Sequence, residues 1–451
     1  MAPPPRTSHL INARLIDPET GYDGPGSLKI VGDKIEEIAR GEGALPAALA
    51  KEKDDNPFYD DAPPKPSSNV FDCQGKVLAP GIVDMRVFVG EPGARHRESF
   101  RSAGEAAAAG GVTTIVAQPD TNPAMDDPAV ISFALSRARQ VAAVNVVAMG
   151  ALTKGLAGRE MTEQRFLLDA GAVALTDGDH AIADTKLMSA IMTYATGTGA
   201  LIVHHPQDPS LSKGTCATSG EFASRRGLPS VPAIAERIML ERDLALAEST
   251  GARYHADQIT TEAALEPLRR VKRPGLQISA GVSIHHLTLN EFDVADYRTF
   301  FKLTPPLRAE DDRRAVVDAA ASGLIDVIHS GHLPQDEETK RLPFEEAATG
   351  AVGLETLLPA ALRLVHDGSL DLVTLFDRLA KRPADLLRLP TGRLATGSQA
   401  DLILMDPDAP FVLDRDQLKS RSKNTPFDRT RMQGKVLQTW VRGRSVFQGD
   451  G

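Results

Sequence analysis

Residues 77–88 of this chain bear most directly on its chemistry. An apolar strand follows the Pro80-Gly81 turn and ends in Asp84-Met85-Arg86-Val87-Phe88. Because side chains alternate between the two faces of a strand, Arg86 and Phe88 point the same way. In a metal-dependent hydrolase built on a barrel, a His-x-His pair at such positions offers two imidazoles to one metal ion. A guanidinium stays protonated and a phenyl ring has no lone pair, so this pair cannot bind zinc.

The elements that position these residues alternate between strands and helices. Helical patterns cover residues 99–109, 183–195, 233–249 and 311–322, and two more follow at 353–366 and 370–386. Apolar strand candidates cover residues 82–88, 113–118, 145–150, 172–177, 201–205, 253–258, 276–283 and 325–331. Eight strands joined by crossover helices predict an α/β fold, a closed (β/α)8 TIM barrel.

Both ends of the chain are β-rich. Short strands are expected within residues 8–38, 401–405 and 435–447. Neither end has a core of its own, so we expect the two to meet in one small β-sandwich; two unrelated extensions are the alternative. The predicted domains are residues 1–79, with an exposed insertion near 41–69 that is rich in Ala, Pro, Asp and Lys, then the barrel at 80–387, then 388–451.

The overall composition excludes several classes of partner. The chain has 451 residues, a net charge of −9 and a pI near 5.7, which argues against nucleic acid or an anionic membrane as the main partner. Its two cysteines, Cys73 and Cys216, form no Cys-x-x-Cys motif. No run reaches the roughly 18 apolar residues of a membrane span. We therefore expect a cytoplasmic protein.

Catalysis in a barrel takes place at the C-terminal ends of the strands. The fourth strand ends at Asp177 and the fifth at His205, which are plausible metal ligands, whereas the sixth ends at Gln258, a poor zinc ligand. The eighth ends at Gly331, where a carboxylate base would be useful. Catalytic zinc usually has three protein ligands, so two do not make a dependable site. A rearranged site with nearby histidines is the alternative, and its candidates are His180, His204, His329 and His332.

Arg86 and Phe88 have two interpretations. In the simpler one the barrel mouth is filled, Phe88 packs against its neighbours, and Arg86 pairs with a nearby carboxylate. In the other, Arg86 binds an anionic ligand.

Across its length the chain resembles dihydroorotase of the amidohydrolase superfamily. The resemblance rests on ordered blocks, namely Pro80-Gly81-Ile82-Val83-Asp84, Glu91-Pro92-Gly93, Ala108-Ala109-Gly110-Gly111-Val112-Thr113-Thr114, Pro305-Pro306-Leu307-Arg308, Gly353-Leu354-Glu355-Thr356 and Asn424-Thr425-Pro426-Phe427. The resemblance implies that Asp177 and His205 match two metal ligands of the family. The other functional positions differ: metal histidines match Arg86, Phe88 and Gln258, substrate-binding residues match Gly90, Asp120, Thr304 and Gln335, and the catalytic aspartate matches Gly331.

Metal ligands, base and substrate anchors are thus altered together, so no catalytic residue is expected. The chain looks like the inactive dihydroorotase-like subunit that in some bacteria assembles with aspartate transcarbamoylase of pyrimidine biosynthesis. That resemblance implies the aspartate transcarbamoylase catalytic chain as partner, an oligomeric state and no cofactor. The first alternative is an active metal-dependent cyclic amidohydrolase with an altered zinc site. The second is a small-molecule sensor in which Arg86 holds an anion.

Overall fold

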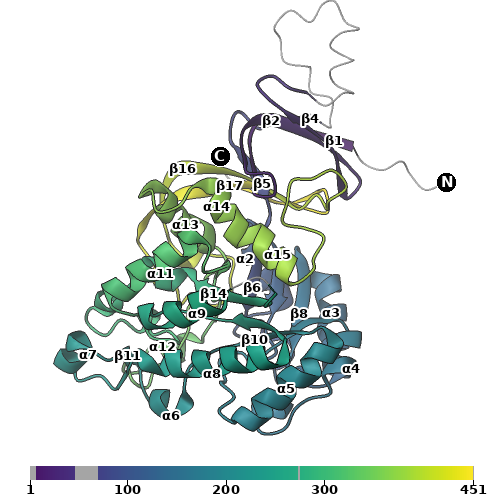
Figure 1. Cartoon of the computed structure of the whole chain (residues 1–451). Helices are drawn as coiled ribbons and strands as arrows, with labels where there is room; N and C mark the ends of the chain where they lie inside the picture. Colours follow the sequence, from purple (N-terminus) through teal and green to yellow (C-terminus); the bar gives the residue numbers. More distant parts are fainter. Residues whose placement is uncertain (1–6, 46–69, 273–274, 450–451) are drawn as a thin grey trace, which may run out of the picture.

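The computed structural model describes residues 7–45, 70–272 and 275–449. From residue 46 onward, the predicted insertion near 41–69 lies outside the described residues. The described chain forms a parallel barrel surrounded by helices and, above it in Figure 1, a sheet built from both ends of the chain. The domain boundaries at 79/80 and 387/388 stay predictions.

The barrel consists of eight parallel strands in sequence order. They are β6 (Ile82–Val87), β7 (Val112–Ala117), β8 (Asn145–Gly150), β9 (Ala172–Leu175), β10 (Leu201–His204), β13 (Arg253–Ala256), β14 (Ile278–Ser283) and β15 (Val327–His329). A parallel bridge from Val87 to His332 brings the first strand beside the segment after the last, so the barrel nearly closes. The prediction of eight barrel strands is confirmed. Several strands end one or two residues before their predicted ends, because the following residues already belong to loops at the barrel mouth.

Helices lie outside the barrel strands. The longer ones are α2 (Phe100–Ala109), α3 (Pro128–Val141), α4 (Gln164–Asp169), α5 (Thr185–Thr198), α8 (Ile234–Thr250), α9 (Leu265–Val271), α11 (Glu310–Ser322) and α13 (Leu357–His366). Shorter helices and strands fill the loops, namely α6 (Pro209–Ser212), β11 (Ala217–Thr218), α7 (Glu221–Arg226), β12 (Ser230–Val231), α10 (Ile284–Thr288) and α12 (Glu337–Lys340). Helix α2 starts where the sequence predicts, because the Ser99 hydroxyl accepts the Ser102 N–H at 3.2 Å.

The two ends of the chain form one continuous sheet. Its strands are β1 (Thr7–Asp17), β2 (Tyr22–Val31), β3 (Lys34–Arg40), β4 (Val70–Asp72), β5 (Val77–Pro80), β16 (Leu402–Val412), β17 (Arg431–Val441) and β18 (Arg444–Gln448). Antiparallel pairing of β5 with β16 joins the N-terminal strands to the C-terminal ones. Leu15, Leu78 and Leu404 are buried in its core beside Trp440. The expected meeting of the two ends is confirmed.

The terminal sheet contacts the barrel and its helices at several places, two of which lie close to β6. Strand β5 runs into β6 through Gly81, where an added Cβ would lie 2.2 Å from the Thr113 side chain, so only glycine fits this close approach. The segment α14 (Leu372–Phe376), η5 (Asp377–Lys381) and α15 (Arg382–Leu386) contacts β1 and β2 through its start and β6 through its end. The link to β5 and the contacts with the α14–α15 segment therefore fix the start of β6, the strand that carries Arg86.

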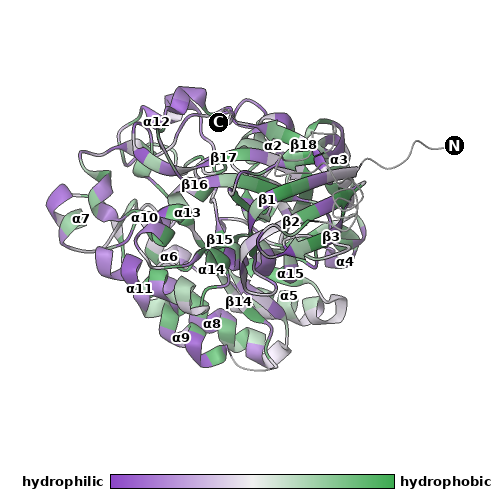
Figure 2. Cartoon of the chain, turned by 90° about the horizontal axis from the view of Figure 1, so that it is seen from above, coloured by the Kyte–Doolittle hydropathy of each residue, from purple (hydrophilic) through white to green (hydrophobic). Residues whose placement is uncertain are grey.

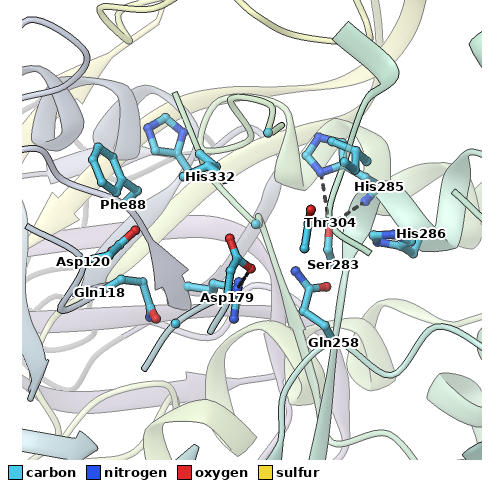
Figure 3. A pocket seen from close by; sticks show the side chains of 16 residues that line it. Phe88, Gln118, Asp120, Asp179, Gln258, Ser283, His285, His286, Thr304 and His332 are labelled. Atoms are coloured by element: carbon cyan, nitrogen blue, oxygen red, sulfur yellow. Dashed lines mark hydrogen bonds and ion pairs between the residues drawn. The ribbon is translucent and has the colours of Figure 1, made fainter. Parts of the chain in front are cut away.

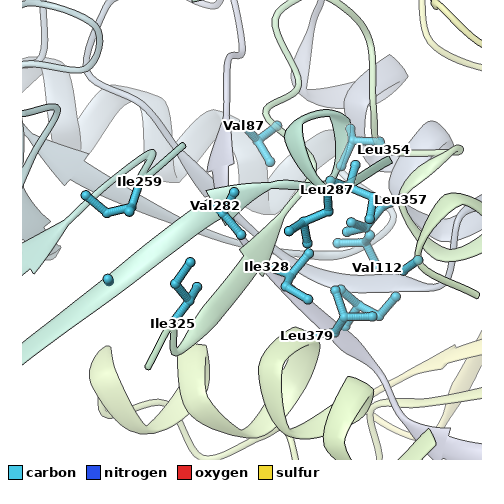
Figure 4. Packing of buried hydrophobic residues seen from close by; sticks show 14 of the residues in the cluster. Val87, Val112, Ile259, Val282, Leu287, Ile325, Ile328, Leu354, Leu357 and Leu379 are labelled. Carbon is cyan, nitrogen blue, oxygen red and sulfur yellow. The ribbon is translucent and has the colours of Figure 1, made fainter. Parts of the chain in front are cut away.

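A hydrophobic core fixes the barrel strands. Val87, Val112, Val282 and Ile328 on four barrel strands are buried together with Leu357 of α13 (Figure 4). Apolar colour follows β1 and β17, while polar residues are prominent on the outer helices α7, α11 and α12 (Figure 2). Among the described residues, no helix has the length and hydrophobicity that crossing a membrane requires.

Candidate functional site

The candidate site is a small cavity at the C-terminal ends of the barrel strands (Figure 3). Its labelled lining residues come from the ends of six barrel strands and the segments that follow them, and are Phe88, Gln118, Asp120, Asp179, Gln258, Ser283, His285, His286, Thr304 and His332; Arg86 and Gly331 also line the cavity. The cavity volume is about 30 Å³. Sites for small organic ligands usually measure roughly 300–1,000 Å³, so this cavity has room for only one or two water molecules.

Arg86 carries the positive charge of the cavity, and two carboxylates neutralise it. Its guanidinium contacts Asp179, in the loop after β9, and Asp257, directly after β13. The side chains of Arg86 and Asp257 are only 9% and 5% exposed, and that of Asp179 is 33% exposed. The prediction that Arg86 pairs with a nearby carboxylate is confirmed. A guanidinium held between two carboxylates offers no net positive charge to an anionic ligand.

Phe88 packs in the wall of the cavity. Its side chain is buried, and the Arg97 guanidinium lies over the ring at 4.1 Å from the ring centroid. The Nε of Arg97 donates to the carbonyl of Pro334 at 2.9 Å, which holds the cation over the ring. The interpretation of Phe88 as a packing residue is confirmed.

Asp177 is bound within the barrel wall and does not line the cavity. Its carboxylate accepts the N–H groups of Leu152 and Thr153 at 2.8 and 3.0 Å and the Thr153 hydroxyl at 2.5 Å. Burial raises the pKa of this carboxyl. The cavity is lined by Asp179, two residues further on. The assignment of Asp177 to a metal-ligand position stays a prediction.

His205 is buried without a hydrogen-bonding partner. Its side chain is 2% exposed, and neither ring nitrogen has a hydrogen-bond partner among the described residues. Burial lowers its pKa to about 3, so the imidazole is neutral at pH 7. It does not line the cavity directly. The structure thus buries His205 as a neutral imidazole, and its assignment to a metal-ligand position stays a prediction.

The altered family positions fall into two groups. Asp120, Gln258, Thr304 and Gly331 line the same cavity, whereas Gly90 and Gln335 do not. An added Cβ at Gly90 would lie 2.2 Å from the Ala94 carbonyl, so a longer side chain does not fit there. Gln335 donates from Nε2 to the Thr349 carbonyl at 2.6 Å. Neither residue lines this cavity.

Asp120 and Gly331 make the cavity unfavourable for an anionic substrate and for proton transfer. Burial, followed by repulsion from Asp179, raises the pKa of Asp120 to about 6, so at pH 7 it is mainly an anion. Gly331 has φ +60°, and an added Cβ would lie 3.0 Å from the Ser283 hydroxyl. No side chain reaches into the cavity from this position, and a replacement would be strained.

The histidines considered for a rearranged metal site are scattered. His204 is 2.7 Å from Asp243 through Nδ1 and accepts the Ile182 N–H at Nε2. His332 lies 3.3 Å from Glu98 and accepts the Gly353 N–H. His329 Nε2 is 3.1 Å from Asp257, and His180 is exposed. In the part of the chain that the structure describes, no three His, Cys, Asp or Glu side chains are grouped to hold a metal ion. The donor set does not fit a catalytic zinc.

Asp179 and Asp257 were not identified from the sequence. The sequence does contain a signal for these two residues. An arginine at a barrel mouth requires a carboxylate partner, and both aspartates lie at or just beyond the ends of predicted strands. Asp179 lies two residues after Asp177, and Asp257 directly precedes Gln258, the two strand-end residues that the resemblance matches to metal-ligand positions of the family.

Comparisons with known proteins agree with the fold. A family model described as dihydro-orotase-like matches residues 75–264. A protein named dihydroorotase from Anaplasma phagocytophilum (strain HZ) is 37% identical over 446 residues, covering 98% of this chain and 96% of that protein. A protein named dihydroorotase-like protein from Pseudomonas aeruginosa is 36% identical over 443 residues, covering 98% and 100%. The solved structure of L-hydantoinase (dihydropyrimidinase) from Arthrobacter aurescens has a TM-score of 0.84 at 24% identity and covers 98% of this chain and 96% of its own; it supports the fold alone.

Proposed function

This chain belongs to the dihydroorotase-like family of the amidohydrolase superfamily, and from that premise we propose that it is a non-catalytic member serving as an assembly subunit for aspartate transcarbamoylase in pyrimidine biosynthesis. The proposed loss of catalysis rests on one observation: the guanidinium of Arg86 is bound between Asp179 and Asp257 at the barrel mouth.

The chemistry of dihydroorotase explains why this arrangement supports loss of catalysis. Opening or closing the dihydroorotate ring requires a metal ion that lowers the pKa of bound water from about 15.7 to about 7. A carboxylate must also move a proton, which contributes roughly 10²- to 10⁴-fold in rate. Here the guanidinium of Arg86 contacts the acidic residues Asp179 and Asp257, and Gly331 provides no base. No single substitution would restore both the metal ion and the base.

The size and charge of the cavity support the same conclusion. A volume of about 30 Å³ does not accommodate a six-membered ring with a carboxylate. Asp120, which is mainly ionised at pH 7, would repel the negative charge of dihydroorotate or carbamoyl aspartate. Binding of either compound would require the cavity to open and Asp120 to be neutralised.

Buried hydrogen bonds and an ion pair stabilise the barrel although the site is altered. Arg308, from the Pro-Pro-Leu-Arg block, is 2% exposed, donates to the Thr260 hydroxyl at 2.9 Å and lies 3.4 Å from Glu236. Glu236 also accepts the N–H groups of Thr260 and Thr261 at 2.9 and 3.0 Å. This block therefore supports the fold rather than the cavity. Selection that acts on the outer surface of the protein would retain the folded barrel while the site changes.

The assembly role is tested by purifying an aspartate transcarbamoylase catalytic chain with and without this protein. We expect a larger, defined complex and altered transcarbamoylase activity only when both chains are present. R86K, which changes the cavity and leaves the outer surface intact, should assemble like the unmodified chain. A transcarbamoylase that reaches the same size and activity alone would contradict the assembly role.

A further inference from the structure

Aromatic side chains are gathered on two loops at the mouth of the barrel, and these form what we call the aromatic patch: Phe222, Arg226, Phe292 and Tyr297. Phe222 and Arg226 lie on α7, in the connection after β10, while Phe292 and Tyr297 follow β14. Phe292 and Tyr297 are exposed. The rings of Phe222 and Phe292 meet edge to face with 5.7 Å between their centroids. The Arg226 guanidinium lies 5.7 Å from the Phe222 centroid and 5.5 Å from that of Tyr297, so it joins the two loops.

Hydrogen bonds and an ion pair hold the patch in one arrangement. The Tyr297 hydroxyl donates to the Arg226 carbonyl at 2.8 Å, and the Arg226 guanidinium lies 3.3 Å from Asp296. On its inner side the Tyr297 ring packs against the buried ring of Phe344 at 6.4 Å between centroids. Because these side chains are already ordered, contact with another protein would cost little further conformational entropy.

The backbone that presents Tyr297 is strained. Ala295 has φ +47° and ψ −115°, and Tyr297 has φ +58°. Residues with a Cβ rarely adopt these angles, so the loop keeps this shape at a cost to the stability of the fold. An aromatic ring exposed to water brings no compensating hydrophobic gain. Strain of this kind is concentrated at functional surfaces, and exposed apolar groups that lie together indicate contact with another protein.

The surroundings of the patch are acidic. Residues 221–226, 291–298 and 336–346 carry nine acidic and five basic residues, a formal net charge of −4 out of −9 for the whole chain. The last two of these segments are joined where Lys340 Nζ donates to the Thr299 carbonyl at 3.0 Å, and helices α7 and α12 lie on the same side of the molecule (Figures 1 and 2). Complementary charge therefore favours a partner that presents lysine or arginine here.

We propose that the aromatic patch is the surface through which this chain docks its assembly partner, and that the partner contributes an apolar side chain flanked by lysine or arginine. The inference rests on the proposed function, which makes the partner the aspartate transcarbamoylase catalytic chain. Tyrosine and arginine are enriched among the residues that dominate the binding energy of protein interfaces. The acidic surroundings would add to the rate of association and to its dependence on salt.

The test measures assembly of the transcarbamoylase catalytic chain with F292S/Y297S and with a matched control, F166S/Y194S. Phe292 and Tyr297 are 63% and 42% exposed, and Phe166 on α4 and Tyr194 on α5 are 61% and 40% exposed, so the two double variants remove equal apolar surface. We expect F292S/Y297S to bind at least about tenfold more weakly than the unmodified chain, and F166S/Y194S to bind like it. Sedimentation velocity gives the affinity and also the size of each variant alone.

A charge variant tests the same surface without changing a ring. E345K/E346K reverses two exposed charges next to Phe344 and should weaken assembly most at low salt, whereas E105K, on the exposed side of α2, should not. If thermal unfolding shows that F292S/Y297S does not fold, E345K/E346K decides the question.

The inference and the proposed function fail in different ways. If the unmodified chain assembles and F292S/Y297S and E345K/E346K assemble equally well, the inference is wrong and the proposed function stands. Loss of assembly in F166S/Y194S instead would place the contact on α4 and α5, and a change in the size of F292S/Y297S alone would mean that the patch binds a second copy of this chain; either result overturns the inference. An unmodified chain that does not assemble rejects the proposed function and the inference with it.

Discussion

The double variant R86H/F88H is expected to show no dihydroorotase turnover, although it recreates the His-x-His pair on β6. Arg86 contacts the buried Asp257 and the half-buried Asp179, and an imidazole is too short to contact both, so we expect a loss of about 3 kcal/mol in the free energy of unfolding. Any zinc that the variant binds would still lack a proton-transferring carboxylate, because position 331 is glycine. The measurements are a dihydroorotase assay with added zinc and denaturant unfolding.

A matched control separates the two expected effects. R86K/F88Y keeps a cation and an aromatic ring at the same positions, so it should lose less stability than R86H/F88H and should also be inactive. Turnover by the histidine variant would show that Gly331 and Gln258 do not prevent the reaction, and the proposed loss of catalysis would then be wrong.

Acid is expected to reduce the stability of the chain through its buried histidines. Burial lowers to about 3 the pKa values of His205, His255, His285, His286 and His329. Between pH 6.5 and about 3 the unfolded chain binds these protons and the folded chain does not, so stability falls as the pH falls. Each histidine contributes about 1.4 kcal/mol per pH unit in this window.

A carboxyl group whose pKa is raised in the folded chain acts in the opposite direction. Burial raises the pKa of Asp120 to about 6, so protonation of Asp120 stabilises the folded chain as the pH falls from 6 toward 3.8, the pKa of this group in the unfolded chain.

A comparison of single-site variants separates the effect of one histidine from that of the carboxyl groups. H205L loses no hydrogen bond, and its stability relative to the unmodified chain should rise by about 1.4 kcal/mol for each pH unit below 6.5. I202V, a neighbouring buried substitution that does not titrate, should differ from the unmodified chain by the same amount at every pH; a flat difference for H205L would contradict the prediction.

The fold could be predicted from the sequence because hydrophobic patterning controls it. The barrel strands are short apolar runs between amphipathic helices, and all eight appear in the structure. The meeting of the chain ends followed from the need of each end for a core. Positions after the strands were less predictable, because loop geometry there depends on contacts such as Asp177 with Thr153, which no local pattern specifies.

The site could be predicted in part. The residue types at 86, 88 and 331 predict that these positions supply neither metal ligands nor a base, because a guanidinium, a phenyl ring and a glycine cannot perform those roles. The partners of Arg86 could not be chosen, since several aspartates follow the strands and spacing alone does not rank them. The small cavity volume depends on side-chain packing across the barrel, which appears only in three dimensions.

The most direct measurement combines zinc content with a dihydroorotase assay on the purified, unmodified chain, run in both directions with zinc supplied. Because Arg86 neutralises Asp179 and Asp257 and no carboxylate stands at position 331, we expect substoichiometric zinc and a rate equal to that in buffer. Stoichiometric zinc together with turnover of dihydroorotate or carbamoyl aspartate would contradict the account.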